Sequence, residues 1–167
     1  MNPPGQGSTA DLHPRSPIGR PGYSADMSLP SSARTLIASG RLGHLHTTNP
    51  DGSPQVSVVW VGIDGDDLVV GHMGTGAKIR NIRRDPRVAV SFDAEERNPI
   101  GMAYTLIVHG EAALHEGGAP ALLQELARVY VSPDAVFPPF PNPPEGHVIR
   151  IRPTRVSGVG PWVDENR

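Results

Sequence analysis

A glycine-containing loop followed by a run of basic residues is the part of this sequence best suited to chemistry. The stretch Gly71–Arg87 reads Gly-His-Met-Gly-Thr-Gly-Ala-Lys-Ile-Arg-Asn-Ile-Arg-Arg-Asp-Pro-Arg. It predicts a strand that ends near Met73 and a helix that begins at about Ala77 and ends before Pro86, since proline disfavours helix in the residue before it. Free N–H groups at a helix start attract anions, and glycines let the backbone approach a ligand closely. This order of elements indicates a phosphate site.

The positive charges of this segment allow two interpretations. Lys78 and Arg80 lie in the first turn of the predicted helix, where the helix dipole disfavours a cation by roughly 0.3–1 kcal/mol. A bound phosphate would reverse that penalty. The alternative is a solvated basic helix between two strands, and the residues alone leave both open. The spacing Gly-x-x-x-x-Gly-x-Lys, with no serine or threonine after the lysine, excludes a P-loop, and a Rossmann fingerprint is also absent.

Histidines are the other candidates for chemistry. His44 and His46 share one face of a predicted strand and could form a metal pair, but no third ligand follows at a motif spacing, so we predict no metal site. His72 stands just before the anion loop, where it could touch a cofactor ring or simply pack. Motifs for nucleophilic or metal-dependent hydrolysis are absent. An oxidoreductase whose cofactor carries the chemistry needs no such motif, and no catalytic residue is predicted.

Length and composition favour one folded domain preceded by an arm. The chain has 167 residues, a net charge of −2 and no cysteine, which gives nucleic-acid binding no whole-protein support and excludes disulfides. No apolar run approaches the roughly 20 residues of a membrane span, and the start lacks the apolar core of a secretory signal. We therefore expect a cytoplasmic protein. Residues 1–29 are rich in proline, glycine and serine and are expected to be disordered, with residues 30–167 as the domain.

The elements that would position the anion loop are mainly strands. Ser31 or Ser32 is expected to cap a helix over Ala33–Ser39. A turn at Asn49–Gly52 should join a strand at 43–48 to a long strand at 54–63, and a strand at 68–73 should complete a three-stranded meander. Further elements are predicted as a strand at 87–92, a charged loop at 93–101, a strand at 102–114, a helix at 120–131, a proline-rich loop at 133–144 and strands at 146–152 and 154–163.

This pattern predicts a mainly β (α+β) fold with about seven antiparallel strands and about three short helices. Most strands follow one another without an intervening helix, which favours an antiparallel barrel over a parallel sheet.

Three segments resemble the pyridoxamine-phosphate-oxidase-like flavin and deazaflavin oxidoreductases. They are Gly43–Ser57, Gly74–Arg87 and Val156–Trp162, and the resemblance extends over about Pro30–Trp162. It implies a split β-barrel and a homodimer that holds its cofactor at the subunit interface, beside a small-molecule acceptor.

The resemblance also implies the cofactor-binding residues. Lys78 matches the phosphate-binding lysine of the family. The loop residues before it and the strand beside the tricyclic ring also match, and His72, Asn81 and Arg84 complete the predicted set, although Arg84 could equally belong to a solvated helix face. The matching loop and strand residues are Thr75, Gly76, Ala77, Pro54, Val56, Ser57 and Val58.

Two differences from the pyridoxamine-phosphate oxidases affect which cofactor we expect. Pyridoxamine-phosphate oxidases carry an arginine and a lysine, five positions apart, on the second strand, where this chain has Ser57-Val-Val-Trp-Val-Gly62. Their carboxy-terminal substrate motif is replaced by Gly158-Val-Gly-Pro-Trp162. The chain looks more like the actinobacterial branch that uses the deazaflavin coenzyme F-420, whose phosphodiester would suit one lysine with nearby arginines and amides.

The resulting prediction is an oxidoreductase in which reduced coenzyme F-420 passes hydride to an unidentified organic acceptor. The alternatives are an FMN-dependent oxidoreductase of the same fold, or a non-catalytic deazaflavin-, flavin- or haem-binding protein.

Overall fold

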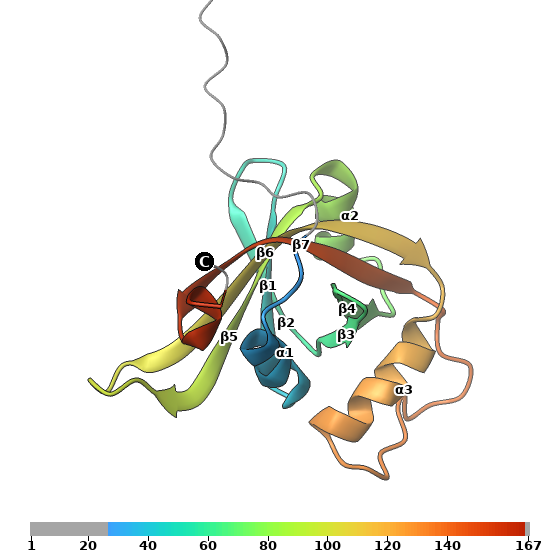
Figure 1. The fold of residues 1–167 in the computed structure, drawn as a ribbon. Helices are drawn as coiled ribbons and strands as arrows, with labels where there is room; N and C mark the ends of the chain where they lie inside the picture. Colours follow the sequence, from blue (N-terminus) through green and yellow to red (C-terminus); the bar gives the residue numbers. More distant parts are fainter. Residues whose placement is uncertain (1–26, 166–167) are drawn as a thin grey trace, which may run out of the picture.

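Alternation of apolar and polar residues along the chain produces a sheet of seven antiparallel strands in the computed structural model, which describes residues 27–165 (Figure 1). Three α-helices and one short 3-10 helix flank the sheet. The strands are β1 Gly43–Thr48, β2 Pro54–Val59, β3 Gly62–Asp64, β4 Asp67–His72, β5 Arg87–Arg97, β6 Ala103–Glu116 and β7 His147–Val159. The helices are α1 Ser31–Ala38, α2 Ala77–Arg84, α3 Ala119–Tyr130 and η1 Pro161–Val163. The predicted antiparallel α+β fold is confirmed.

The strand order β2-β1-β5-β6-β7-β4-β3 makes the sheet curl into a split barrel. β2 and β3 follow each other in the chain with only Trp60 and Val61 between them, yet they occupy opposite edges of the sheet. Two residues span only a few ångströms, so the two edges must approach each other. β2 and β3 do not pair, and the barrel stays open along this seam.

The prediction of one long strand over residues 54–63 was wrong, and so was the three-stranded meander. The Tyr130 hydroxyl accepts a hydrogen bond from the Val61 N–H at 2.9 Å and lies 3.0 Å from the Val61 carbonyl oxygen. The Trp60 ring stacks on the Tyr130 ring with centroids 5.5 Å apart. Because α3 takes up the backbone groups of Val61, the strand ends there and the chain crosses the seam.

Two other strand boundaries also differ from the prediction. The strands expected at 146–152 and 154–163 form the single strand β7, because a register shift opposite His109 and Gly110 accommodates Pro153, which has no N–H to donate. β5 continues to Arg97 through part of the expected charged loop. There the β5–β6 hairpin projects from the barrel (Figure 1), and charged side chains reach water from the strand.

The start of α1 is not capped by its own serines. The residue before the helix is Pro30, and no side chain caps the helix locally. Instead the Glu165 carboxylate accepts hydrogen bonds from the Ser31 hydroxyl at 3.0 Å and the Ser32 N–H at 3.3 Å. A carboxylate at this position also interacts favourably with the helix dipole. Leu36 and Ile37 of this helix are buried in the core.

The packed part of the chain begins before residue 30. Leu29 is 3% exposed within the core, and Met27 packs against that core. Residues 1–26, which make up most of the predicted arm, lie outside the described residues. None of the helices between residues 27 and 165 is long and apolar enough to cross a membrane.

Candidate functional site

The predicted anion loop and basic helix are present with the expected boundaries. β4 ends at His72, and α2 runs from Ala77 to Arg84. Gly76 caps the helix through its backbone, with its carbonyl oxygen accepting from the Ile79 N–H at 3.1 Å. No side chain hydrogen-bonds to the start of α2 among the described residues. The first N–H groups of the helix are thus available to an anion.

Buried contacts hold α2 against the barrel. Ile79 and Ile82 face the core, and Asn81 is 2% exposed. The Asn81 amide nitrogen donates to the Thr47 hydroxyl at 3.0 Å and to the Asn49 side-chain oxygen at 2.9 Å. These bonds fix the position of α2 relative to the β1–β2 turn.

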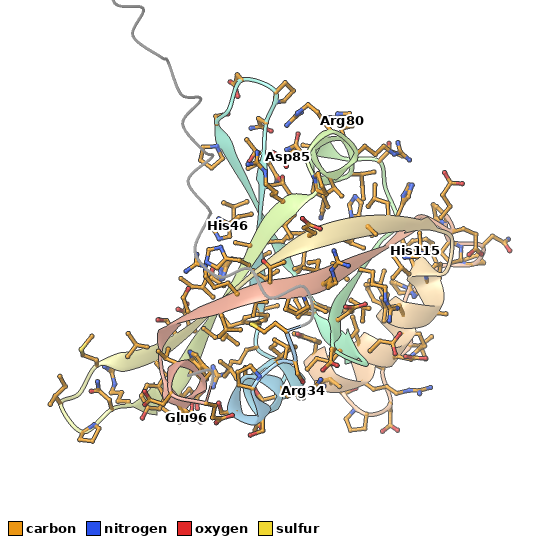
Figure 2. All side chains as sticks on the ribbon, turned by 45° about the horizontal axis from the view of Figure 1, so that its top comes forward. Arg34, His46, Arg80, Asp85, Glu96 and His115 are labelled. Atoms are coloured by element: carbon orange, nitrogen blue, oxygen red, sulfur yellow. The ribbon has the colours of Figure 1, made fainter. Side chains whose placement is uncertain are left out.

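Arg84 adds a second link to the same turn. Its guanidinium donates to the carbonyl oxygen of Thr48 and lies 3.5 Å from the Asn81 side-chain oxygen. Arg80, by contrast, is exposed on the outer side of α2, as Figure 2 shows, and donates to the Thr75 carbonyl oxygen at 3.0 Å. Asn81 and Arg84 therefore tie the helix to its support, and Arg80 braces the loop before it.

Asn81→Ala should destabilise the protein by about 1–3 kcal/mol, since it leaves the buried Thr47 hydroxyl and the partly buried Asn49 side chain without their donor. Urea unfolding measures this loss. Arg80→Ala on the same helix is the control, with an expected change within about 0.5 kcal/mol because the side chain is exposed. An Asn81→Ala protein of unchanged stability but weakened coenzyme binding would show that the amide serves the ligand instead.

A cavity of about 230 Å³ lies beside the ammonium-bearing side chain of Lys78. We call it the Lys78 cavity. It brings together three residues from separate parts of the predicted set, Val58 on β2, His72 on β4 and Lys78 on α2. Its other lining residues are Val59, Trp60, Gly71, Met73, Leu123 and Phe137. The cavity is mainly apolar with one basic group at its border.

The other predicted residues do not line this cavity. Thr75, Gly76 and Ala77 form the loop that leads directly into Lys78. Val56 and Ser57 precede Val58 on the edge strand β2, and the Ser57 hydroxyl accepts from the Gln55 side chain at 2.8 Å. Pro54 lines a separate cavity of about 290 Å³ together with His46 and His109.

Electrostatics at the cavity favour an anionic ligand. Burial lowers the pKa of Lys78 from its usual 10.5. No carboxylate forms an ion pair with this ammonium among the described residues. A partly buried ammonium without a counter-ion gains more from a phosphate than a solvated one does.

His72 lies beneath the glycine loop. A Cβ added at Gly74 would stand 3.3 Å from its Nε2 atom, and one at Gly76 would stand 3.6 Å away. Burial lowers the pKa of His72, and the charges of Lys78 and His147 lower it further. The ring is therefore neutral at pH 7, and its buried Nε2 has no hydrogen-bond partner among the described residues. Small residues at 74 and 76 let the loop pass close over this ring.

Two aromatic walls of the cavity were not predicted. Trp60 lies in the predicted strand over residues 54–63, two positions after Val58, so its position offered a signal. Phe137 belongs to the proline-rich loop after α3 and offered none. The two rings meet at 5.0 Å in a tilted contact. Gln124 holds the loop in place, because its side chain accepts from the Phe137 N–H at 3.0 Å and donates to the Ala135 carbonyl oxygen at 2.8 Å.

Comparison with known proteins places this fold in a family. Residues 29–160 match the family model of pyridoxamine 5'-phosphate oxidase. Among solved structures, an F-420 reductase is 31% identical, with 77% of this chain and 98% of that chain covered and a TM-score of 0.64. A haem-binding protein from Mycobacterium smegmatis is 25% identical, covering 82% of this chain and 56% of that one, with a TM-score of 0.57.

A more distant structure shares the fold alone. It is a conserved hypothetical protein from Mycobacterium tuberculosis, 18% identical, with 86% and 92% of the two chains covered and a TM-score of 0.61. No curated protein matches the sequence significantly. The family model covers most of the chain and the described fold is that of its structural relatives, so this chain belongs to the pyridoxamine 5'-phosphate oxidase family.

Proposed function

We propose that this protein is an oxidoreductase that uses reduced coenzyme F-420 to transfer hydride to an organic acceptor. The observation that carries the proposal is the single cation of the Lys78 cavity. Lys78 is the only basic side chain, apart from the neutral His72, among the residues that line it, and β2 contributes none. One ammonium with free helix N–H groups suits a phosphodiester, which carries one charge. The 31% identity to an F-420 reductase supports the same choice.

Different residues around the cavity would bind different parts of this coenzyme. Lys78 and the loop Thr75–Ala77 would bind the phosphodiester, and the apolar side of Val58 would lie along the ring. Trp60 and Phe137 would keep water from the ring system. The coenzyme, when bound, supplies the hydride, and the protein supplies orientation and a dry environment.

FMN is the second candidate, because the matching family model is that of a flavin enzyme. A non-catalytic binder is the third, since one structural relative is a haem-binding protein. Oxidation of the reduced deazaflavin in the presence of a panel of acceptors separates an enzyme from a carrier, and haem titration tests the third candidate directly.

Coenzyme F-420 is expected to bind at least tenfold more tightly than FMN, a difference of about 1.4 kcal/mol. The terminal phosphate of FMN carries close to two charges, and this chain has Ser57 and Gly62 where pyridoxamine-phosphate oxidases have two cations. Fluorescence titration with each cofactor measures both constants. Ser57→Arg is the matched variant. It should bind FMN more tightly and so reduce the difference between the two affinities. Equal or tighter FMN binding by the unmodified protein would contradict the proposal.

We further propose that two copies form a dimer through the outer face of the sheet at β2. Val56 and Val58 are 50% and 59% exposed on this edge strand. Adjacent exposed apolar residues on an edge strand usually mark an interface. Light scattering at micromolar concentration should give twice the chain mass of 17.8 kDa, and Val56→Glu should shift the population towards monomer. A stable monomer of the unmodified protein would exclude the proposed interface.

A further inference from the structure

His72 lies under the glycine loop and lines the Lys78 cavity together with Lys78 itself. Its Nε2 atom faces the loop, since Cβ atoms added at Gly74 and Gly76 would stand 3.3 Å and 3.6 Å from it. This nitrogen is buried and has no hydrogen-bond partner among the described residues. The proposed function puts the phosphodiester at Lys78 and at the end of this loop. The charge of the ligand would therefore act on the His72 ring at short range.

The charges next to His72 are positive. Burial lowers the pKa of His72, and the charges of Lys78 and His147 lower it further. The strand register places Glu116 of β6 opposite His147, which is itself opposite His72, so this carboxylate lies two strand spacings away, roughly 10 Å. The Glu145 carboxylate accepts from the N-cap N–H of α3 at 3.2 Å. The His72 imidazole is therefore neutral at pH 7 in the free protein.

Of the two neighbouring histidines, His72 is the one that can take up a proton without losing a bond. The Arg83 guanidinium lies 3.1 Å from the Nε2 atom of His147. A guanidinium can only donate, so this nitrogen accepts, and a proton added there would replace the bond by a repulsion. His72 has no such bond at Nε2. Its protonation is opposed by burial, by the neighbouring Lys78 and by the exposed Arg80, which donates to the loop backbone.

An anion bound at the loop changes this balance in two ways. It neutralises the ammonium of Lys78, and it attracts a proton to the imidazole below the loop. Both effects raise the pKa of His72. By thermodynamic linkage, the protonated protein then binds the anion more tightly, by the same factor by which the anion increases the proton affinity.

We propose that the anion site binds its ligand, a phosphate ester or similar oxyanion, together with a proton that the His72 imidazole holds beneath the glycine loop. This inference rests on the proposed function, and it gives the site a second positive charge beside that of Lys78. Affinity is highest at acidic pH, where His72 is already protonated in the free protein. It falls as the pH rises, until the complex also loses the proton.

Nuclear magnetic resonance of the full-length protein without coenzyme tests this coupling. Sulfate is the probe, because its charge does not change over the pH range in which histidine titrates. The ring signals of His72 are identified by their proximity to Gly74. At constant ionic strength, saturating sulfate should move the titration midpoint of His72 upward by about half a pH unit or more. The midpoint of His115, which is exposed on β6, should not change.

Calorimetric titration with sulfate measures the same coupling as an affinity. The unmodified protein should bind sulfate about threefold or more tightly at about pH 5.5 than at about pH 8. His72→Gln should lose this difference, and the control His115→Gln should keep it.

The outcomes separate this inference from the proposed function. Sulfate binding that Lys78→Ala weakens, with an unchanged His72 midpoint or with a pH dependence that survives in His72→Gln, would overturn the proton uptake and leave the phosphate site in place. Absence of sulfate binding, or binding that Lys78→Ala does not weaken, would overturn both.

Discussion

Replacing Lys78 by alanine is expected to weaken coenzyme F-420 binding tenfold or more while the fold stays intact. A charge-assisted hydrogen bond to a phosphate contributes about 1.5–3 kcal/mol. Among the described residues, no other fixed cation lines the cavity to replace it. The side chain makes no hydrogen bond or ion pair with another described residue, so its loss should cost little stability. Fluorescence titration measures the dissociation constant of the coenzyme, and urea unfolding measures the stability. An unchanged dissociation constant would show that the phosphate binds elsewhere.

The pH dependence of binding identifies the lysine as the group responsible. Burial lowers the pKa of Lys78 below 10.5 in the free protein. The charged form binds the phosphodiester, so affinity should fall as the pH rises through that lowered pKa. Lys78→Arg is the control, because a guanidinium stays charged over this range. The ratio of the two dissociation constants removes any titration of the coenzyme itself, and a ratio that does not change with pH would contradict this role.

Replacing Gly158 by alanine is expected to destabilise the protein by about 3 kcal/mol or more. Gly158 has a φ of +116°, and an added Cβ would stand 2.0 Å from the Thr105 carbonyl oxygen. That oxygen belongs to the backbone of β6, the strand paired with β7 at this point. Relief would require the two strands to separate, so the clash cannot be removed by a side-chain rotation. Urea unfolding should show a large decrease in the midpoint.

A substitution at a second glycine distinguishes the steric clash with Thr105 from backbone strain. Gly52 in the β1–β2 turn also has a positive φ, +84°, but no atom lies within 4 Å of an added Cβ. Gly52→Ala should therefore cost only the strain of a left-handed residue, about 1–2 kcal/mol. Similar losses for the two variants would show that contact with Thr105 plays no part.

Local sequence rules were sufficient for the anion loop and its helix. Pro86 and Asp85 end α2 where expected, and the turn at Asn49–Gly52 forms as predicted, with the Gly52 N–H donating to the Asn49 carbonyl oxygen at 2.9 Å. These features depend on the φ preferences of proline and glycine and on neighbours a few residues away. The split-barrel fold was predicted from the family resemblance of three segments. The structure and the family match confirm it.

The cofactor-binding set itself stays a prediction. The structure brings Val58, His72 and Lys78 to one cavity, which a loop motif and a strand motif could not establish separately. Asn81 has a structural role that its place in the motif did not indicate. Its amide nitrogen donates to Thr47 and Asn49, because α2 packs on β1.

The sequence by itself therefore determined the elements whose boundaries depend on residues close in the chain, namely the anion loop, α2 and the β1–β2 turn. Only the tertiary structure decided features that depend on distant partners. Tyr130 ends β2 by bonding Val61, and Glu165 supplies the acceptors at the start of α1. Phe137 reaches the Lys78 cavity from the proline-rich loop. Each of these contacts joins residues dozens of positions apart, and the free energy that selects them arises only when the chain has closed into the barrel.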